Sequence, residues 1–268
     1  MEYSIVPKID ITDLGVGRKV GQYTYFQKND AIYYKAPYPF PVEIMISEGL
    51  SKCQVTPAFV KMPFILKGWI NLDILLRLID VMKCALMGVL FFHASCVGET
   101  LIVGFPNSGK TWLTFKMLQM GGELISEEYT LVENGYATPY KPMTRTCVSN
   151  KTIKDCGVKI SWMQRIHLFF TTIRAWLMPF MFEDVIWTKL QTCGKPAKIK
   201  RIVYGSTGSE VKSWKALAIL TENEFPFMAS DFLQAYAIAT GFDIIGIQEK
   251  QRMKIKEFCE SVYPIAES

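Results

Sequence analysis

The sequence predicts a mixed α/β fold, and three of its segments carry that prediction. Residues 1–65 alternate short apolar runs with turn residues, which is typical of β-structure. Between residues 71 and 87 the apolar residues recur every three or four positions, as they do on one face of a helix. From residue 101 an apolar run passes through a glycine-bounded loop into a second apolar pattern, which predicts a strand, a turn and a helix. Strands that alternate with helices indicate the α/β class.

The order of these segments predicts a β-rich portion followed by a larger core. Because roughly 65 residues alone form only a marginal core, we expect residues 1–65 to pack on the rest of the chain. The core, residues 66–268, holds the glycine-bounded loop and a helical insertion at about 146–195. Two strands around a Gly-Ser-Thr-Gly turn come next, and helices at 227–240 and 249–263 close the chain.

The loop "GFPNSGKT" has the spacing of a phosphate-binding loop, with a glycine at each end and a Lys-Thr pair behind it. Lysine brings a point charge to the β- and γ-phosphates, threonine offers a hydroxyl to Mg²⁺, and the following helix directs its N-terminal dipole at the anion. The alternative is a purely structural glycine turn, which the flanking strand and helix disfavour. The predicted nucleotide-binding residues are Gly104, Phe105, Pro106, Asn107, Ser108, Gly109, Lys110 and Thr111.

A pair of acidic residues, Glu127 and Glu128, follows a short apolar run after this helix. One carboxylate in such a place can hold Mg²⁺, and a second can take a proton from an attacking hydroxyl. The alternative is a solvated turn, but apolar residues flank the pair on both sides. We therefore predict that the pair belongs to the site.

One of only two histidines, His93, ends an apolar run ahead of the glycine-bounded loop. A lone buried histidine is commonly a core residue whose nitrogens are hydrogen-bonded, and that alternative stays open. The order of histidine, phosphate loop and carboxylate pair is more distinctive than any one of these features, so His93 is a candidate catalytic residue.

Composition excludes several classes of protein. The 30 Lys and Arg and 25 Asp and Glu are interspersed, so the net charge of +5 does not indicate nucleic-acid binding. The seven cysteines contain no C-x-x-C pair and are expected to be reduced thiols in a cytoplasmic protein. No signal peptide is expected, and charged residues interrupt the apolar stretches 74–92 and 166–182, so we expect no membrane span. The second stretch is also compatible with a contact between copies of the chain.

The segments "HASCVG", "LIVGFPNSGKT", "GGELISEEYTLV" and "ATPYKP" together resemble the HPr kinase/phosphorylase family, whose phosphate-loop core is related to phosphoenolpyruvate carboxykinase. The resemblance covers about 50 residues in order and spacing. It implies a core of that type with a β-rich N-terminal portion. It also implies that His93 and Glu127 assist transfer to a serine hydroxyl, that Glu128 helps with Mg²⁺, and that Lys110 and Thr111 bind the phosphates and the metal.

Two features depart from that family. Its acidic pair is Asp-Asp, whereas this chain has Glu-Glu, whose side chains are longer by one C–C bond of about 1.5 Å. No segment resembles the Gly-Arg-Asn stretch that accompanies the phosphorylase activity of the bifunctional enzymes. We therefore expect neither the reverse reaction nor the phosphocarrier protein as substrate.

The expected function is an ATP- and Mg²⁺-dependent kinase that moves the γ-phosphate to a serine-like hydroxyl of a protein, peptide or small molecule. An arginine could assist transfer, and the first choice is Arg145; the other candidates are Arg165, Arg174 and Arg201. A nucleotide-binding regulatory module with weak or no transfer activity is the alternative, and the Glu-Glu pair favours it. A scaffold that has lost nucleotide binding is a third hypothesis, which Lys110 and Thr111 argue against.

Overall fold

A computed structural model shows a mixed α/β protein whose N-terminal region is rich in β-structure. The chain divides into two compact units, the first formed by residues 1–88 and 225–251 and the second by residues 89–224 and 252–268. The residues described are 2–9, 17–20, 23–28, 31–36, 42–47, 52–57, 72–105, 107–139, 143–177, 185–222, 236–238, 240–241 and 243–264.

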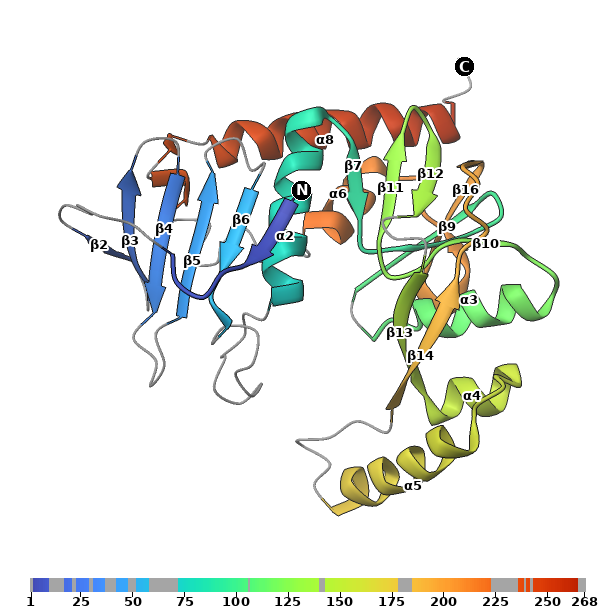
Figure 1. The fold of residues 1–268 in the computed structure, drawn as a ribbon. Coiled ribbons are helices and arrows are strands. Elements are labelled where there is room, and N and C mark those ends of the chain that lie inside the picture. Colours follow the sequence, from blue (N-terminus) through green and yellow to red (C-terminus); the bar gives the residue numbers. More distant parts are fainter. Residues whose placement is uncertain are drawn as a thin grey trace. The chain divides into compact units, whose positions relative to one another are not determined.

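The first unit is built on a six-stranded sheet, seen as the blue strands of Figure 1, in the order β1-β6-β5-β4-β3-β2. Ile44 and Ile46 of β5 are fully buried, whereas Glu43 and Met45, which alternate with them, are partly exposed, as the two-residue period of a strand requires. The expectation of β-structure at the N-terminus is therefore confirmed. The strands are β1 (Glu2–Ile5), β2 (Arg18–Val20), β3 (Tyr23–Lys28), β4 (Ala31–Ala36), β5 (Val42–Ser47) and β6 (Lys52–Val55).

Helix α2 (Leu72–Met87) ends the first segment of this unit and confirms the helix expected at residues 71–87. The expected boundary near residue 65 lies outside the described residues, as does most of the expected helix at 227–240. Helix α8 (Ile244–Val262) is the helix expected at 249–263, begun earlier in the chain.

The second unit contains a five-stranded sheet in the order β10-β8-β9-β16-β17, in which β9 and β16 are parallel neighbours. Helix α3 (Lys110–Gln119) follows β9 directly, so the expected strand, loop and helix are confirmed as secondary structure. The strands are β8 (Ser95–Val97), β9 (Thr100–Val103), β10 (Leu124–Ser126), β16 (Arg201–Tyr204) and β17 (Ser209–Glu210), and a short 3₁₀ turn, η2 (Gly205–Thr207), joins the last two.

Successive residues of β9 face opposite sides of this sheet, because the side-chain period of a strand is two. Ile102 packs with Val203 under Leu113 and Met117 of α3. Leu101, on the opposite face, belongs to a larger buried cluster. The all-apolar sequence of β9 therefore reflects burial on both faces of the sheet.

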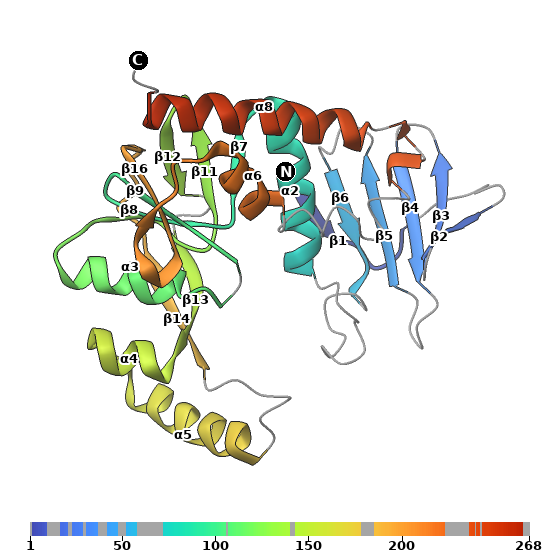
Figure 2. The same ribbon diagram turned by 180° about the vertical axis from the view of Figure 1, so that it is seen from behind.

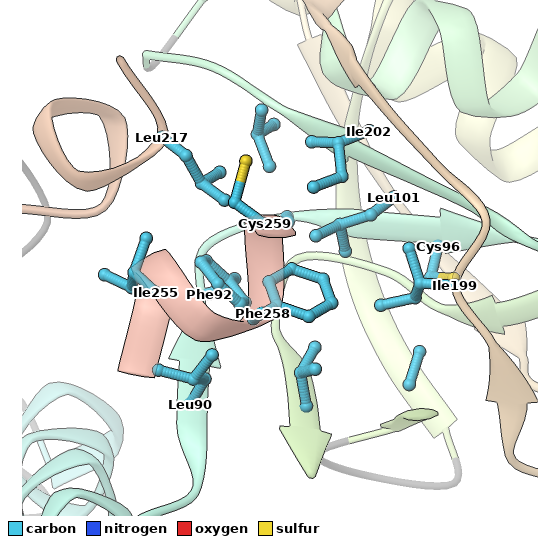
Figure 3. Packing of buried hydrophobic residues seen from close by; sticks show 14 of the residues in the cluster. Leu90, Phe92, Cys96, Leu101, Ile199, Ile202, Leu217, Ile255, Phe258 and Cys259 are labelled. Carbon is cyan, nitrogen blue, oxygen red and sulfur yellow. The ribbon is translucent and has the colours of Figure 1, made fainter. Parts of the chain in front are cut away.

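The larger cluster lies in the second unit (Figure 3). It packs a four-stranded sheet, helix α6 (Trp214–Glu222) and the C-terminal half of α8 against the five-stranded sheet. Phe92 and Phe258 meet at its centre with ring centroids 5.8 Å apart. Tyr263 closes the end of α8, since its hydroxyl accepts from Ile202 N at 2.8 Å and donates to Ile202 O at 3.1 Å. The second sheet runs in the order β15 (Ala197–Lys198), β12 (Tyr136–Pro139), β11 (Thr130–Glu133) and β7 (Leu90–Phe92).

The expected helical insertion at about 146–195 contains helices α4 (Asn150–Cys156) and α5 (Trp162–Leu177). The expectation was wrong in part, because β14 (Val185–Gln191) and the end of β13 (Met143–Ser149) also lie within these bounds and pair with each other. β13 and β14 form an antiparallel pair, and both helices lie at the end of this pair that is farther from β11 and β12 (Figure 2). Phe115 of α3 packs with Val148 and Cys156, so α4 is fixed to the helix that follows the glycine-bounded loop.

The apolar pattern of residues 88–97 predicts a single strand, and this expectation was wrong. These residues form two strands, β7 and β8, which belong to different sheets and are separated by His93 and Ala94. Nothing in the apolar pattern marks this change of sheet, because both strands are buried.

Within the described residues, no helix is long and apolar enough to cross a bilayer.

Candidate functional site

The glycine-bounded loop lies between the end of β9 and the first residue of α3. Gly104 has φ 152° and Gly109 has φ 86°, in the region that favours glycine. A Cβ on Gly104 would collide with the hydroxyl of Ser108, so this position cannot carry a side chain without rearranging the loop. The Ser108 Oγ atom is itself buried and has no hydrogen-bond partner among the described residues.

Lys110 begins α3 and returns its side chain into the loop. The buried ammonium donates to Gly104 O at 2.6 Å and to Phe105 O at 3.1 Å. Its positive charge therefore lies inside the curve of the loop, at the N-terminus of a helix whose dipole also favours anions.

Glu127 follows β10 and is the most enclosed carboxylate of the site, with 4% of its surface exposed. Its Oε1 atom accepts from Thr146 Oγ1 at 2.9 Å and from Thr111 Oγ1 at 3.3 Å. Its Oε2 atom is buried and has no hydrogen-bond partner among the described residues. The structure thus joins two predicted site residues, Thr111 and Glu127, through one carboxylate oxygen.

Burial raises the pKa of Glu127 to about 7, from 4.5. The Thr146 hydrogen bond opposes this rise by stabilising the charged form, whereas the nearby Glu128 carboxylate adds to it. The Thr111 hydrogen bond and the Lys110 charge also lower the pKa, but burial outweighs them. A carboxyl group with this pKa can both release and accept a proton near neutral pH.

Glu128 occupies the centre of a tight turn. Tyr129 N donates to Glu127 O at 2.9 Å, which closes a three-residue γ-turn, and Glu128 has φ 69°. A positive φ is uncommon for a residue with a Cβ and costs on the order of 1–3 kcal/mol. The surrounding strands hold the second acidic residue in a backbone conformation that it would not adopt alone.

His93 reaches the acidic turn through an aromatic contact. Its ring stacks on Tyr129, with centroids 5.1 Å apart and planes inclined by 21°. Thr130 Oγ1 donates to Ala94 O at 2.8 Å and hydrogen-bonds with Ser126 Oγ at 2.5 Å, which ties the residue after His93 to both ends of the acidic turn. The predicted histidine and carboxylates therefore lie in one locality.

Some predicted residues are not brought into the site, or cannot be placed there. Pro106 lies outside the described residues, and so do the side chains of Arg145 and Arg174. Arg165 is exposed on α5. Arg201 pairs with Glu210 at 3.2 Å, so its charge is directed at a neighbouring strand.

Three contributors were missed by the sequence analysis. Thr146, on strand β13, donates a hydrogen bond to Glu127, and the ring of Tyr129 stacks with that of His93. Gly205 lies against the loop so closely that a Cβ there would collide with Ser108 O. The Gly-Ser-Thr-Gly turn around Gly205 was recognised, but no signal in the sequence reveals which segment it contacts.

The oxygen donors around Thr111 suit a hard cation that takes only a few ligands from the protein and the rest from a substrate and water. Within the described residues there is no group of three or more His, Cys, Asp or Glu side chains that could hold a metal by itself. Mg²⁺ commonly takes one or two carboxylates and completes its shell with phosphate oxygens and water. The Thr111 hydroxyl, next to the acidic turn that carries Glu127 and Glu128, fits this coordination pattern.

Neither the protein-family models nor the curated proteins give a match to this chain.

Proposed function

We propose that this protein is an ATP- and Mg²⁺-dependent kinase that transfers the γ-phosphate to a serine-like hydroxyl. The observation that carries the proposal is the contact between Thr111 and Glu127 beside a loop that holds the Lys110 ammonium. It unites the phosphate-loop motif with the acidic pair, which lie apart in the sequence. The resemblance to the HPr kinase core supports the same assignment and extends it to a core of that fold type.

In this proposal the phosphates lie in the glycine-bounded loop. Backbone N–H groups and Lys110 bind the anion, and Lys110 exchanges its two carbonyl partners for phosphate oxygens. Thr111 and Glu128 would hold Mg²⁺, which would neutralise charge that develops on the transferring phosphoryl group.

Glu127 is proposed to accept the proton of the attacking hydroxyl. A general base is most effective when its pKa lies near the working pH, and burial raises the pKa of Glu127 to about 7. Its buried Oε2 atom is the oxygen that can receive the proton. His93 supports the reaction from its stack on Tyr129 by fixing the acidic turn. The acceptor hydroxyl therefore enters on the Glu127 side of the loop.

The first test measures thermal stabilisation by Mg·ATP and Mg·GTP. A ligand that binds only the native state raises the melting temperature, and Lys110→Ala should abolish that rise while the protein stays folded. The matched control is Lys116→Ala, which removes another lysine of α3 away from the loop. Full stabilisation of the Lys110→Ala variant would refute the loop assignment.

The second test separates a kinase from a regulatory module. Transfer of ³²P from γ-labelled ATP is measured with free serine, serine peptides and a cell lysate. Labelling that disappears in Lys110→Ala supports the kinase. Nucleotide binding without labelling or ATP hydrolysis would instead establish the nucleotide-binding regulatory module.

A further inference from the structure

A groove of about 410 Å³ lies next to the glycine-bounded loop, on the side of strands β16 and β17 and helix α6. Phe105 and Tyr204 line it with aromatic rings, and Val211, Ala216 and Ile219 line it with aliphatic groups. Its size falls within the range of about 300–1,000 Å³ that is typical of small-molecule sites.

The groove and the loop are continuous. Phe105 follows Gly104 in the loop and is also part of the groove wall. Gly205, next to Tyr204, lies directly against Ser108. A molecule bound in the loop can therefore extend into the groove without leaving the protein surface.

The strand order gives the site two sides. The loop leaves β9, with β8 and β10 on one side and β16 and β17 on the other. Glu127 follows β10 and contacts Thr111 at the helix end of the loop, whereas the groove adjoins Phe105 at the strand end. A triphosphate whose terminal phosphate points to Glu127 has its other end directed at the groove.

We infer that the groove binds the base of the nucleoside triphosphate, an inference that rests on the proposed function. Phe105 and Tyr204 are the aromatic residues that line the groove, and stacking of a nucleobase on an aromatic ring tolerates any base because every base has a π-face. The acceptor hydroxyl belongs on the other side, where Glu127 can take its proton. Glu210, beside the groove, pairs with both Lys212 and Arg201 at 3.2 Å, so its negative charge is compensated.

The experiment compares Mg·ATP with Mg·tripolyphosphate, which has the phosphates but no nucleoside, by isothermal titration. Ala216→Trp fills the groove from an exposed position of α6, so this variant should fold. The control is Lys215→Trp, the adjacent exposed residue, which does not line the groove. Tyr204→Ala removes an aromatic wall as an independent variant.

The wild type should bind ATP at least about tenfold more tightly than tripolyphosphate, given that one base stack is typically worth about 5- to 150-fold in affinity. Ala216→Trp and Tyr204→Ala should remove most of that difference and leave tripolyphosphate affinity within about twofold of wild type. Lys215→Trp should change neither affinity.

Two results overturn the inference while the proposed function stands: equal wild-type affinity for the two ligands, or wild-type ATP affinity in both groove variants. An equal loss of both ligands in Ala216→Trp also overturns it, because the groove would then belong to the phosphate site. If the wild type binds neither ligand, the proposed function fails together with the inference.

Discussion

At the scale of single residues, the environment of Glu127 determines what the site can do. Burial favours its neutral form, while Thr146 and Thr111 hydrogen-bond the charged form. The balance leaves a carboxyl group with a pKa of about 7 beside a lysine and the N-terminus of a helix. An exposed glutamate, with its ordinary pKa of 4.5, would be a much weaker base at neutral pH.

The raised pKa makes stability depend on pH. Because Glu127 holds its proton more tightly when folded, its stabilising contribution is complete below about pH 4.5 and is lost as pH rises to about 7. The loss is roughly 3 kcal/mol. Glu127→Gln is neutral at every pH and should escape this loss. Urea unfolding should show the two proteins equally stable near pH 4 and the variant more stable near pH 8. Parallel pH profiles would show that Glu127 titrates normally.

Thr146→Val should raise the pKa of Glu127 further, because the Thr146 hydrogen bond stabilises the charged carboxylate. The variant keeps the shape of the side chain and removes its hydroxyl. NMR titration of the glutamate carboxyl carbons measures the shift directly. Thr152→Val, at another buried threonine whose hydroxyl bonds Ser149, should leave this pKa unchanged. A lowered pKa in Thr146→Val would contradict the hydrogen-bond assignment.

The roles of the acidic pair are separable by isosteric amides. Glu127→Gln cannot accept a proton, so transfer should fall by about 10² to 10⁴ while Mg·ATP binding is largely kept. Glu128→Gln removes one charge from the metal site and should weaken the Mg²⁺ dependence of binding. Steady-state kinetics and Mg²⁺ titrations measure the two effects. Wild-type rates and binding in both variants would exclude a catalytic pair.

Restoring the family's Asp-Asp pair tests whether this site has adjusted to glutamate. In a working kinase the backbone is adapted to the longer side chains, so the double variant Glu127→Asp, Glu128→Asp should lose activity. A gain of transfer activity would favour the regulatory module.

At the scale of elements, α5 differs from every other helix described here. Its exposed apolar residues recur at helical spacing and form one stripe along the helix: Trp162, Met163, Ile166, Phe169, Phe170 and Ile173. Leu168 packs inward instead, with the cluster of Phe115 and Val148. The apolar pattern at 162–177 therefore does not correspond to a helix buried on all sides.

Substitutions on α5 and β13 should separate the stripe from the core. Phe169→Ser and Phe170→Ser should change the free energy of unfolding by less than about 0.5 kcal/mol each, because both rings are already in solvent. Val148→Ala, at a fully buried site, should cost about 1–3 kcal/mol. Chemical denaturation measures all three. A large cost at Phe169 or Phe170 would mean that another surface covers the stripe.

At the scale of the whole molecule, α8 belongs to both compact units, since residues up to 251 fall in the first and residues from 252 in the second. Its C-terminal half completes the core behind β9 with Ile255, Phe258 and Cys259. The strand that presents the glycine-bounded loop is thus supported by residues more than 150 positions later in the chain.

Phe258→Ala should therefore destabilise the second unit by about 3–5 kcal/mol, the usual cost of removing a buried aromatic ring. Met253→Ala, at an exposed position of the same helix, should change stability by less than about 0.5 kcal/mol. Urea denaturation measures both changes. Equal effects would show that α8 is not an essential part of this core.

The sequence by itself determined the helices and strands whose formation depends on nearby residues. The strand before Gly104, the helix from Lys110 and the helix ending at Met87 all follow from apolar periodicity and glycine placement, which depend on neighbours within a few residues. The association of Lys110, Thr111 and Glu127 was also expected, because a strand, loop and helix of this order bring such residues together.

Only the tertiary structure decided the surroundings of that site. Thr146, Tyr129 and Gly205 reach it through strand pairing and turn packing, which join residues far apart in the chain and leave no periodic signal. The change of sheet at His93 is invisible for the same reason, since two buried strands in succession read as one apolar run. The pKa of Glu127 depends on enclosure, a property of the folded surface that no residue carries by itself.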